Sequence, residues 1–294
     1  VVERLDGQGA VLVAKTTLGA LAMGDVWFGG KTRNPWTPDK GSSGSSAGSA
    51  AATAAGCLGF SLGTETLGSI VSPCTVCGVT GLRPSFGRVS RYGAMALSWT
   101  MDKIGPICRT VEDCALVFNA IFGPDGKDGT ARYEAPFNWD SARDLKTLKI
   151  GYLKSVFEGE RRDSEWQEND LQTLRVMRSL GVELVPLELP DVPVHLIRLV
   201  LSVEAAAAFD ELTRSGRDDL LVRQSKNAWP NLFRKAQLIS AVDYVQAMRL
   251  RSLLIEKMHA LMSQVDACIA PSWEGRNPLV TNLVGLPAVR LPHA

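Results

Sequence analysis

The sequence predicts an α/β fold with a mixed, mostly parallel central sheet that helices cover on both faces. Predicted strands alternate with predicted helices along almost the whole chain, which is the pattern of a parallel sheet. The run AVLVAK (10–15) is nearly all apolar, as expected for a parallel strand that is buried on both faces. The chain has 294 residues, 45% apolar and 21% charged, which suffices for one large domain with a sizeable core.

Local signals place the individual elements. Alanines favour a helix over 48–56, and Gly56 ends it. Thr110 caps a helix that continues to Gly123, since Asp113 follows the cap after three residues. The predicted strands are 10–15, 57–63, 148–153, 182–189 and 266–272, and the predicted helices are 1–8, 48–56, 110–123, 164–181, 199–215 and 240–265.

Composition excludes several classes of function. The formal net charge is +1, whereas nucleic acids and anionic membranes require a concentrated basic patch. Every apolar run is interrupted well before the ~20 residues of a membrane span. The six cysteines are scattered, and the CxxC of Cys74 and Cys77 has no second pair, so we interpret them as reduced and mostly buried. We therefore expect a cytoplasmic protein that binds neither nucleic acid nor membrane directly.

The two ends of the chain have the pattern of internal segments. A helix and a strand are predicted within the first 15 residues, and a strand-like run, GLPAVRLPHA, ends at Ala294. Neither an initiator Met nor a signal sequence is visible. We expect the chain to be a fragment, truncated at both ends, of a longer protein.

Two glycine-rich stretches carry the chemistry. The first, GSSGSSA (41–47), opens into the alanine-rich helix, and the second, 61–94, is dense in glycine, the residue of close backbone approach. They contain GSSAGSAAATAAG (44–56), GTETLGSI (63–70) and CGVTGLRPSFGRVSRYG (77–93), and DKIGPICRTVEDCALV (102–117) follows. Together with VVERLDGQGAVLVAKTTL (1–18), these motifs resemble the amidase signature family. The resemblance implies a single domain over 1–294, with 1–123 as its signature core and 147–294 as the remainder.

The resemblance also implies a site of two serines and a lysine. The nucleophile would be Ser69, and the bridging serine, which family members hold next to a cis peptide bond, would be Ser45. Ser45 would receive the proton of Ser69 and pass it to a neutral lysine. Backbone N–H groups of Thr66, Leu67, Gly68 and Ser69 would form the oxyanion hole. The implied substrate is a small-molecule amide, no metal or organic cofactor is needed, and a homodimer is left open.

Three positions depart from the family pattern. Leu67 stands where glycine is usual, Glu65 replaces an aspartate, and Val71 stands where arginine is common. The catalytic lysine is expected upstream of Val1, because it precedes the first serine by several tens of residues in the family. Lys15 resembles a different lysine of the family, which we interpret as structural.

Other functions fit the same sequence. The A component of a glutamine-dependent tRNA amidotransferase shares these motifs, and a non-catalytic member that binds a ligand or partner would as well. The departures at positions 67 and 71 favour a stand-alone amidase. An α/β-hydrolase is the weakest alternative: 44–48 fits G-x-S-x-G with Ser46 as nucleophile, but the fold needs a strand before it and a histidine partner (His195, His259 or His293).

Overall fold

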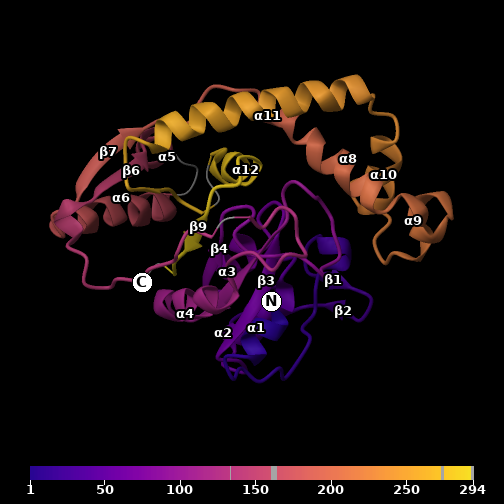
Figure 1. Ribbon diagram of the computed structural model, residues 1–294, viewed down its shortest axis with the longest axis horizontal. Helices are drawn as coiled ribbons and strands as arrows, with labels where there is room; N and C mark the ends of the chain where they lie inside the picture. Colours follow the sequence, from indigo (N-terminus) through magenta and orange to yellow (C-terminus); the bar gives the residue numbers. More distant parts are fainter. Residues whose placement is uncertain (133, 160–163, 273–274, 293–294) are drawn as a thin grey trace.

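The computed structural model describes residues 1–132, 134–159, 164–272 and 275–292, and it has an α/β fold (Figure 1). The helices are α1 (Val2–Asp6), α2 (Ala47–Ala54), α3 (Val71–Cys77), α4 (Val111–Ile121), α5 (Lys154–Glu158), α6 (Ser164–Ser179), α7 (Val194–Ile197), α8 (Leu199–Ala208), α9 (Asp210–Arg214), α10 (Trp229–Ala236), α11 (Ala241–Met262) and α12 (Asn277–Leu283). The strands are β1 (Val26–Trp27), β2 (Gly30–Lys31), β3 (Phe60–Glu65), β4 (Thr80–Arg83), β5 (Lys103–Cys108), β6 (Lys149–Leu153), β7 (Glu183–Leu187), β8 (Ala267–Ile269) and β9 (Ala288–Arg290).

The sheet that carries the serine motifs is antiparallel, which corrects the prediction of a mostly parallel central sheet. Its strand order is β3-β5-β4-β9, and each neighbouring pair is antiparallel. Strands β3 and β4, which α3 connects, do run parallel to each other, as the alternation of strands and helices predicts. However, β5 enters between β3 and β4 in the opposite direction. The register places Lys103 directly opposite Glu65, so both side chains lie on the same face of the sheet.

Helices cover both faces of this sheet, as predicted. On one face Ala50 of α2, Cys74 of α3 and Ile70, which directly precedes α3, pack in one cluster with Ile107 of β5. On the other face Phe118 and Ile121 of α4 pack against other sheet residues, Leu62, Leu82 and Ile104. Successive side chains of a strand point to opposite faces of the sheet, so neighbouring residues contact helices on different faces.

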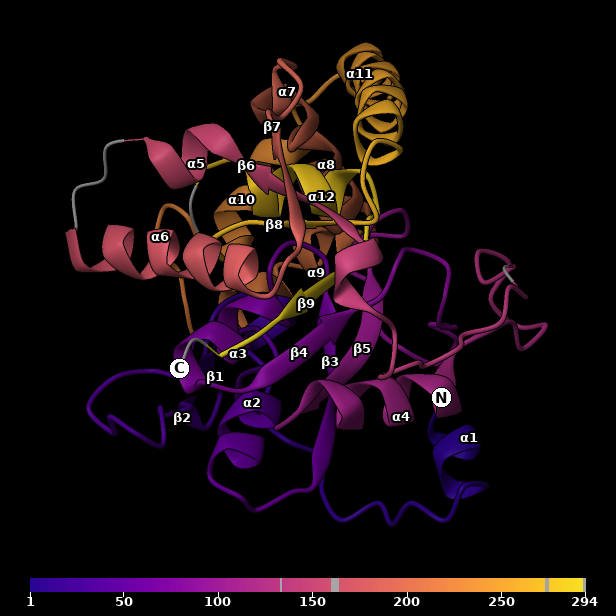
Figure 2. The same ribbon diagram turned by 90° about the vertical axis from the view of Figure 1, so that its left-hand side faces the viewer.

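A second sheet and a group of helices complete the fold. Strands β7-β6-β8 form a parallel sheet, and β1 and β2 form a separate antiparallel pair (Figure 2). The long helix α11 packs on α7 and α8 through an apolar cluster that also contains α12, and it extends along one side of the molecule in Figure 1. In the part of the chain that is described, no helix combines the length and apolar character needed to cross a membrane.

Some predicted elements differ from the structure. The segment 10–15 is not a buried strand: it pairs with no described strand, and Val11 and Leu12 are 82% and 77% exposed. An apolar run becomes a buried strand only where a neighbouring strand and covering helices meet it, and the described chain brings none to this segment. The predicted strand 57–63 corresponds to β3, which begins three residues later and ends two residues later. The predicted helix 199–215 is divided at Phe209 into α8 and α9.

Several local predictions are confirmed. Thr110 accepts a hydrogen bond from the N–H of Asp113 and caps α4, which ends one residue before Phe122. All six cysteines are free thiols, and four of them, Cys74, Cys77, Cys108 and Cys114, are buried.

Candidate active site

Ser45 lies at the bottom of a tight loop in front of α2. The peptide bond between Gly44 and Ser45 is cis, as the resemblance implied, and the residue is fully buried. Its carbonyl oxygen accepts a hydrogen bond from the N–H of Gly19 at 3.1 Å. A Cβ atom on Gly44 would lie 1.9 Å from the carbonyl oxygen of Gly24, so only glycine fits there. The Ser45 hydroxyl has no hydrogen-bond partner among the described residues.

Ser46 connects the loop of Ser45 to the segment of Ser69. Its N–H donates to the carbonyl oxygen of Ser69 at 3.1 Å, while its hydroxyl donates to the carbonyl of Thr64 and accepts from the N–H of Thr64. The hydroxyl is thus used by the backbone of β3. No strand directly precedes the loop that leads to Ser45. This arrangement is not the nucleophile elbow of an α/β-hydrolase. Of the three histidines considered as partners of Ser46, His293 lies outside the described residues.

Ser69 sits in the turn between β3 and α3. The turn contains Thr66, Leu67 and Gly68, and Gly68 has φ of +93°, a value that a side chain rarely tolerates. Ser69 is 8% exposed. The hydrogen bond from the N–H of Ser46 to the carbonyl oxygen of Ser69 brings the two serine segments side by side. The hydrogen bond expected between the hydroxyls of Ser45 and Ser69 is not formed in this structure, since the Ser45 hydroxyl is unpartnered among the described residues.

Glu65 fixes the far end of this turn. Its carboxylate accepts hydrogen bonds from the N–H groups of Ile70 and Val71, at 2.7 and 2.9 Å. The other carboxylate oxygen accepts from Arg83 at 2.9 Å and from Asn282 at 2.8 Å. Burial acts to raise the pKa of Glu65, but the Arg83 charge and these hydrogen bonds outweigh it, and the pKa lies below its ordinary value. The carboxylate is therefore ionised and makes the supporting bonds despite replacing the shorter aspartate.

Asp102 fixes the near end of the turn. One of its oxygens accepts from the hydroxyl of Thr66 at 2.5 Å, and the other accepts from the N–H groups of Leu97 and Ser98. Glu65 and Asp102 thus hold the two ends of the segment that carries Ser69. Thr66 is 6% exposed, so water competes little for its bond to Asp102.

Lys103, which sequence reasoning missed, is buried beside these carboxylates. It is 3% exposed, and its ammonium group donates to the carbonyl oxygen of Met101. Burial, followed by repulsion from Arg83, lowers the pKa of Lys103 from 10.5 to about 7, although Glu65 and Asp102 oppose the shift. The available sequence signal was a lysine at the start of the strand-like run KIGPIC. Lys15, by contrast, is exposed.

Several known proteins are similar to this chain. A family model described as Amidase matches residues 1–284. The chain is 40% identical over 229 residues to the A component of the Glutamyl-tRNA(Gln) amidotransferase of Bacillus velezensis, covering 74% of this chain and 47% of that protein. It is 35% identical to the protein of the same name from Roseiflexus castenholzii, with 92% and 60% covered.

Solved structures of two amidases are also similar to this chain. A crystal structure of an amidase matches with a TM-score of 0.83 and 26% identity, covering the whole of this chain and 69% of that one. The peptide amidase of Stenotrophomonas maltophilia matches with a TM-score of 0.79 and 27% identity over the same shares. The chain spans about half of the Bacillus protein's length and about two thirds of the length of the solved structures.

Proposed function

This chain belongs to the amidase family, and we propose that it carries the nucleophile of a hydrolase that cleaves a carboxamide C–N bond through an acyl-enzyme on Ser69. The observation that carries the proposal is the hydroxyl of Ser45. It is fully buried and has no hydrogen-bond partner among the described residues, and the N–H of the next residue, Ser46, donates to the carbonyl oxygen of Ser69. An unpartnered buried hydroxyl is costly for stability, and such groups are frequent at catalytic sites.

In the proposed reaction the Ser69 hydroxyl attacks the amide carbonyl carbon as Ser45 takes its proton and passes its own to a lysine. The carbonyl oxygen becomes an oxyanion, which the backbone N–H groups of residues 66–69 stabilise; one such donor contributes about 3–4 kcal/mol to the transition state. The C–N bond then breaks, and the relay returns the proton to the leaving amine. Water hydrolyses the resulting ester by the same route and restores Ser69.

This proposal assigns the role of base to none of the described lysines. No described lysine bonds to the Ser45 hydroxyl, and the Lys103 ammonium is engaged by Met101.

Labelling with a serine-directed phosphonate tests the assignment. Mass spectrometry of the labelled protein is expected to find the adduct on Ser69, with none in Ser69→Ala and at least ~100-fold slower labelling in Ser45→Ala. Ser155→Ala, which changes an exposed serine bonded to Glu188, is the matched control and is expected to label normally. A full-length protein that takes no label at Ser69 would refute the enzyme assignment and favour a non-catalytic binding protein.

A second candidate is the A component of a tRNA amidotransferase, favoured by the identity of 40% to a protein of that name. The two candidates differ in their dependence on partner proteins. Hydrolysis of aryl, aliphatic or aminoacyl amides by the protein alone supports the amidase. Glutaminase activity that appears only with the other amidotransferase components added supports the amidotransferase. The homodimer and the cytoplasmic location stay predictions, to be measured by light scattering and by cell fractionation.

A further inference from the structure

A buried polar network surrounds the loop of residues 97–102, which joins the candidate site to the helices of the second half of the chain. Glu204 of α8 is 4% exposed and accepts hydrogen bonds from the Ser98 hydroxyl at 2.5 Å and from the Thr100 N–H at 3.1 Å. It also accepts from the hydroxyls of Thr100 and Tyr244, at 2.8 and 3.1 Å. Four donors occupy the acceptor sites of this carboxylate.

Arg251 of α11 holds the same loop from a second helix. Its guanidinium donates to the hydroxyl of Thr100 at 2.6 Å, to the carbonyl of Thr100 at 2.8 Å and to the carbonyl of Leu283 at 2.6 Å. The Thr100 hydroxyl therefore accepts from Arg251 and donates to Glu204. Both charged side chains are more than nine-tenths buried, so their bonds are little weakened by water.

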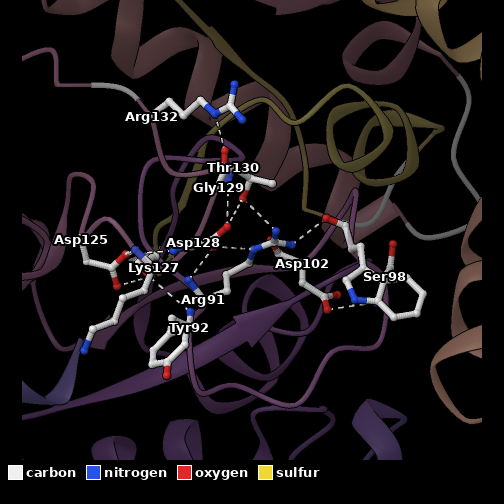
Figure 3. A network of polar contacts seen from close by, with 12 residues as sticks. Arg91, Tyr92, Ser98, Asp102, Asp125, Lys127, Asp128, Gly129, Thr130 and Arg132 are labelled. Atoms are coloured by element: carbon white, nitrogen blue, oxygen red, sulfur yellow. Dashed lines mark hydrogen bonds and ion pairs between the residues drawn. The ribbon is translucent and has the colours of Figure 1, made fainter.

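A third set of contacts to the loop comes from Arg91. Arg91 donates to the carbonyl of Trp99 at 2.8 Å, and its own backbone and side chain bond to Asp128 (Figure 3). Its guanidinium also donates to the Thr130 hydroxyl. The loop is thus tied to α8, to α11 and to the connection around residue 128.

These bonds converge on Asp102. The N–H groups of Leu97 and Ser98 donate to one oxygen of Asp102, and Thr66 donates to the other. A continuous series of hydrogen bonds therefore runs from Glu204 and Arg251 through the loop to Thr66, the first residue of the candidate oxyanion turn.

Stability alone does not explain this network. Leu97 and Met101 already anchor the loop in two apolar clusters. Burying a carboxylate and a guanidinium is costly, and apolar residues of similar volume would often stabilise such a place equally well. A saturated polar network does fix one geometry of the groups it bonds.

We propose that Glu204, Arg251 and Thr100 are positioning residues for the acyl site, holding the 97–102 loop so that Asp102 sets the position of Thr66 and the turn to Ser69. The inference rests on the proposed function for its catalytic meaning. The hydrogen-bond series itself does not depend on which amide the protein cleaves.

Thr100→Val and Thr100→Ser test the proposal in the full-length protein. Valine has nearly the volume of threonine but lacks the hydroxyl that joins Glu204 to Arg251, whereas serine keeps it. Two quantities are measured: the rate of phosphonate labelling at Ser69, and hydrogen exchange of the amides of residues 66–70. Tyr152→Phe, which removes one hydrogen bond to Glu158 in the parallel sheet, is the control for a lost hydroxyl remote from the site.

We expect Thr100→Val to label about 10-fold more slowly or worse and to exchange faster at residues 66–70. Thr100→Ser is expected to keep most of the wild-type labelling rate and exchange protection. Tyr152→Phe is expected to change neither the labelling rate nor the exchange. A Thr100→Val protein with a lower Tm but wild-type labelling and exchange at residues 66–70 would overturn the proposal. If the wild type itself takes no label, the proposed function fails, and exchange at these amides alone decides whether the loop positions the turn.

Discussion

Replacing Lys103 by methionine should remove a specific pH dependence of folding. Lys103 is an amine 3% exposed, opposite Glu65 on the neighbouring strand. Besides Glu65, the charged groups acting on it are Asp102, Arg83 and Arg251. Methionine has a similar length and no charge, so the substitution removes the titration and keeps most of the packing.

The size of the effect follows from the pKa. Burial lowers the pKa of Lys103 from 10.5 to about 7. Between these two values the unfolded chain binds a proton that the folded protein does not, so stability increases as pH rises. Below pH 7 both states bind the proton, and this contribution to the slope disappears. The lowered pKa corresponds to about 5 kcal/mol in all, of which about 2–3 kcal/mol is gained between pH 6 and pH 9.

Urea unfolding at pH 6, 7, 8 and 9, followed by tryptophan fluorescence, measures this difference. Comparing wild type with Lys103→Met cancels the titration of other groups. We expect the stability of Lys103→Met relative to wild type to fall by about 2–3 kcal/mol from pH 6 to pH 9. Lys257→Met, on an exposed position of α11, should follow the wild-type profile. Parallel profiles for wild type and Lys103→Met would refute the reasoning.

Three further substitutions have defined outcomes. Gly44→Ala would place a Cβ 1.9 Å from the carbonyl oxygen of Gly24, and we expect a loss of about 1–3 kcal/mol or more in urea unfolding. Arg83→Met leaves Glu65 buried without its cation and should cost about 3–5 kcal/mol, part of which the added substitution Glu65→Gln recovers; an unchanged urea midpoint would contradict this. Thr110→Ala removes the cap of α4 and should cost about 1 kcal/mol, whereas Thr110→Ser should be nearly neutral by thermal unfolding.

The sequence was informative where the structure depends on local chemistry. Thr110 and Asp113 are three residues apart, and they form the predicted cap. The resemblance led to the cis bond before Ser45 in the same way, through a short motif. These features require no knowledge of which distant segments meet.

Other features depend on contacts between distant segments. The apolar segment 10–15 has the composition of a buried strand, but in the described chain it lacks a neighbouring strand and is exposed. The insertion of β5 between β3 and β4 changed a predicted parallel sheet into an antiparallel one. The pKa of Lys103 depends partly on Arg251, which lies about 150 residues further along the chain. Hydrophobic periodicity contains no information on such pairs.

The first 123 residues and the residues beyond 190 contribute differently to the candidate site. The proposed nucleophile, the proton carrier and the oxyanion turn all lie within residues 1–123. Three of the side chains that support them lie beyond residue 190: Asn282 bonds to Glu65, and Glu204 and Arg251 bond to the 97–102 loop. Strand β9 pairs with β4 and thereby joins the last described residues to the same sheet. Residues 1–123 thus contain every predicted site residue and one buried partner of Glu65, Arg83. They lack Asn282, the other side-chain partner of Glu65, and the partners of Thr100 on α8 and α11, so the geometry of the site depends on the whole chain.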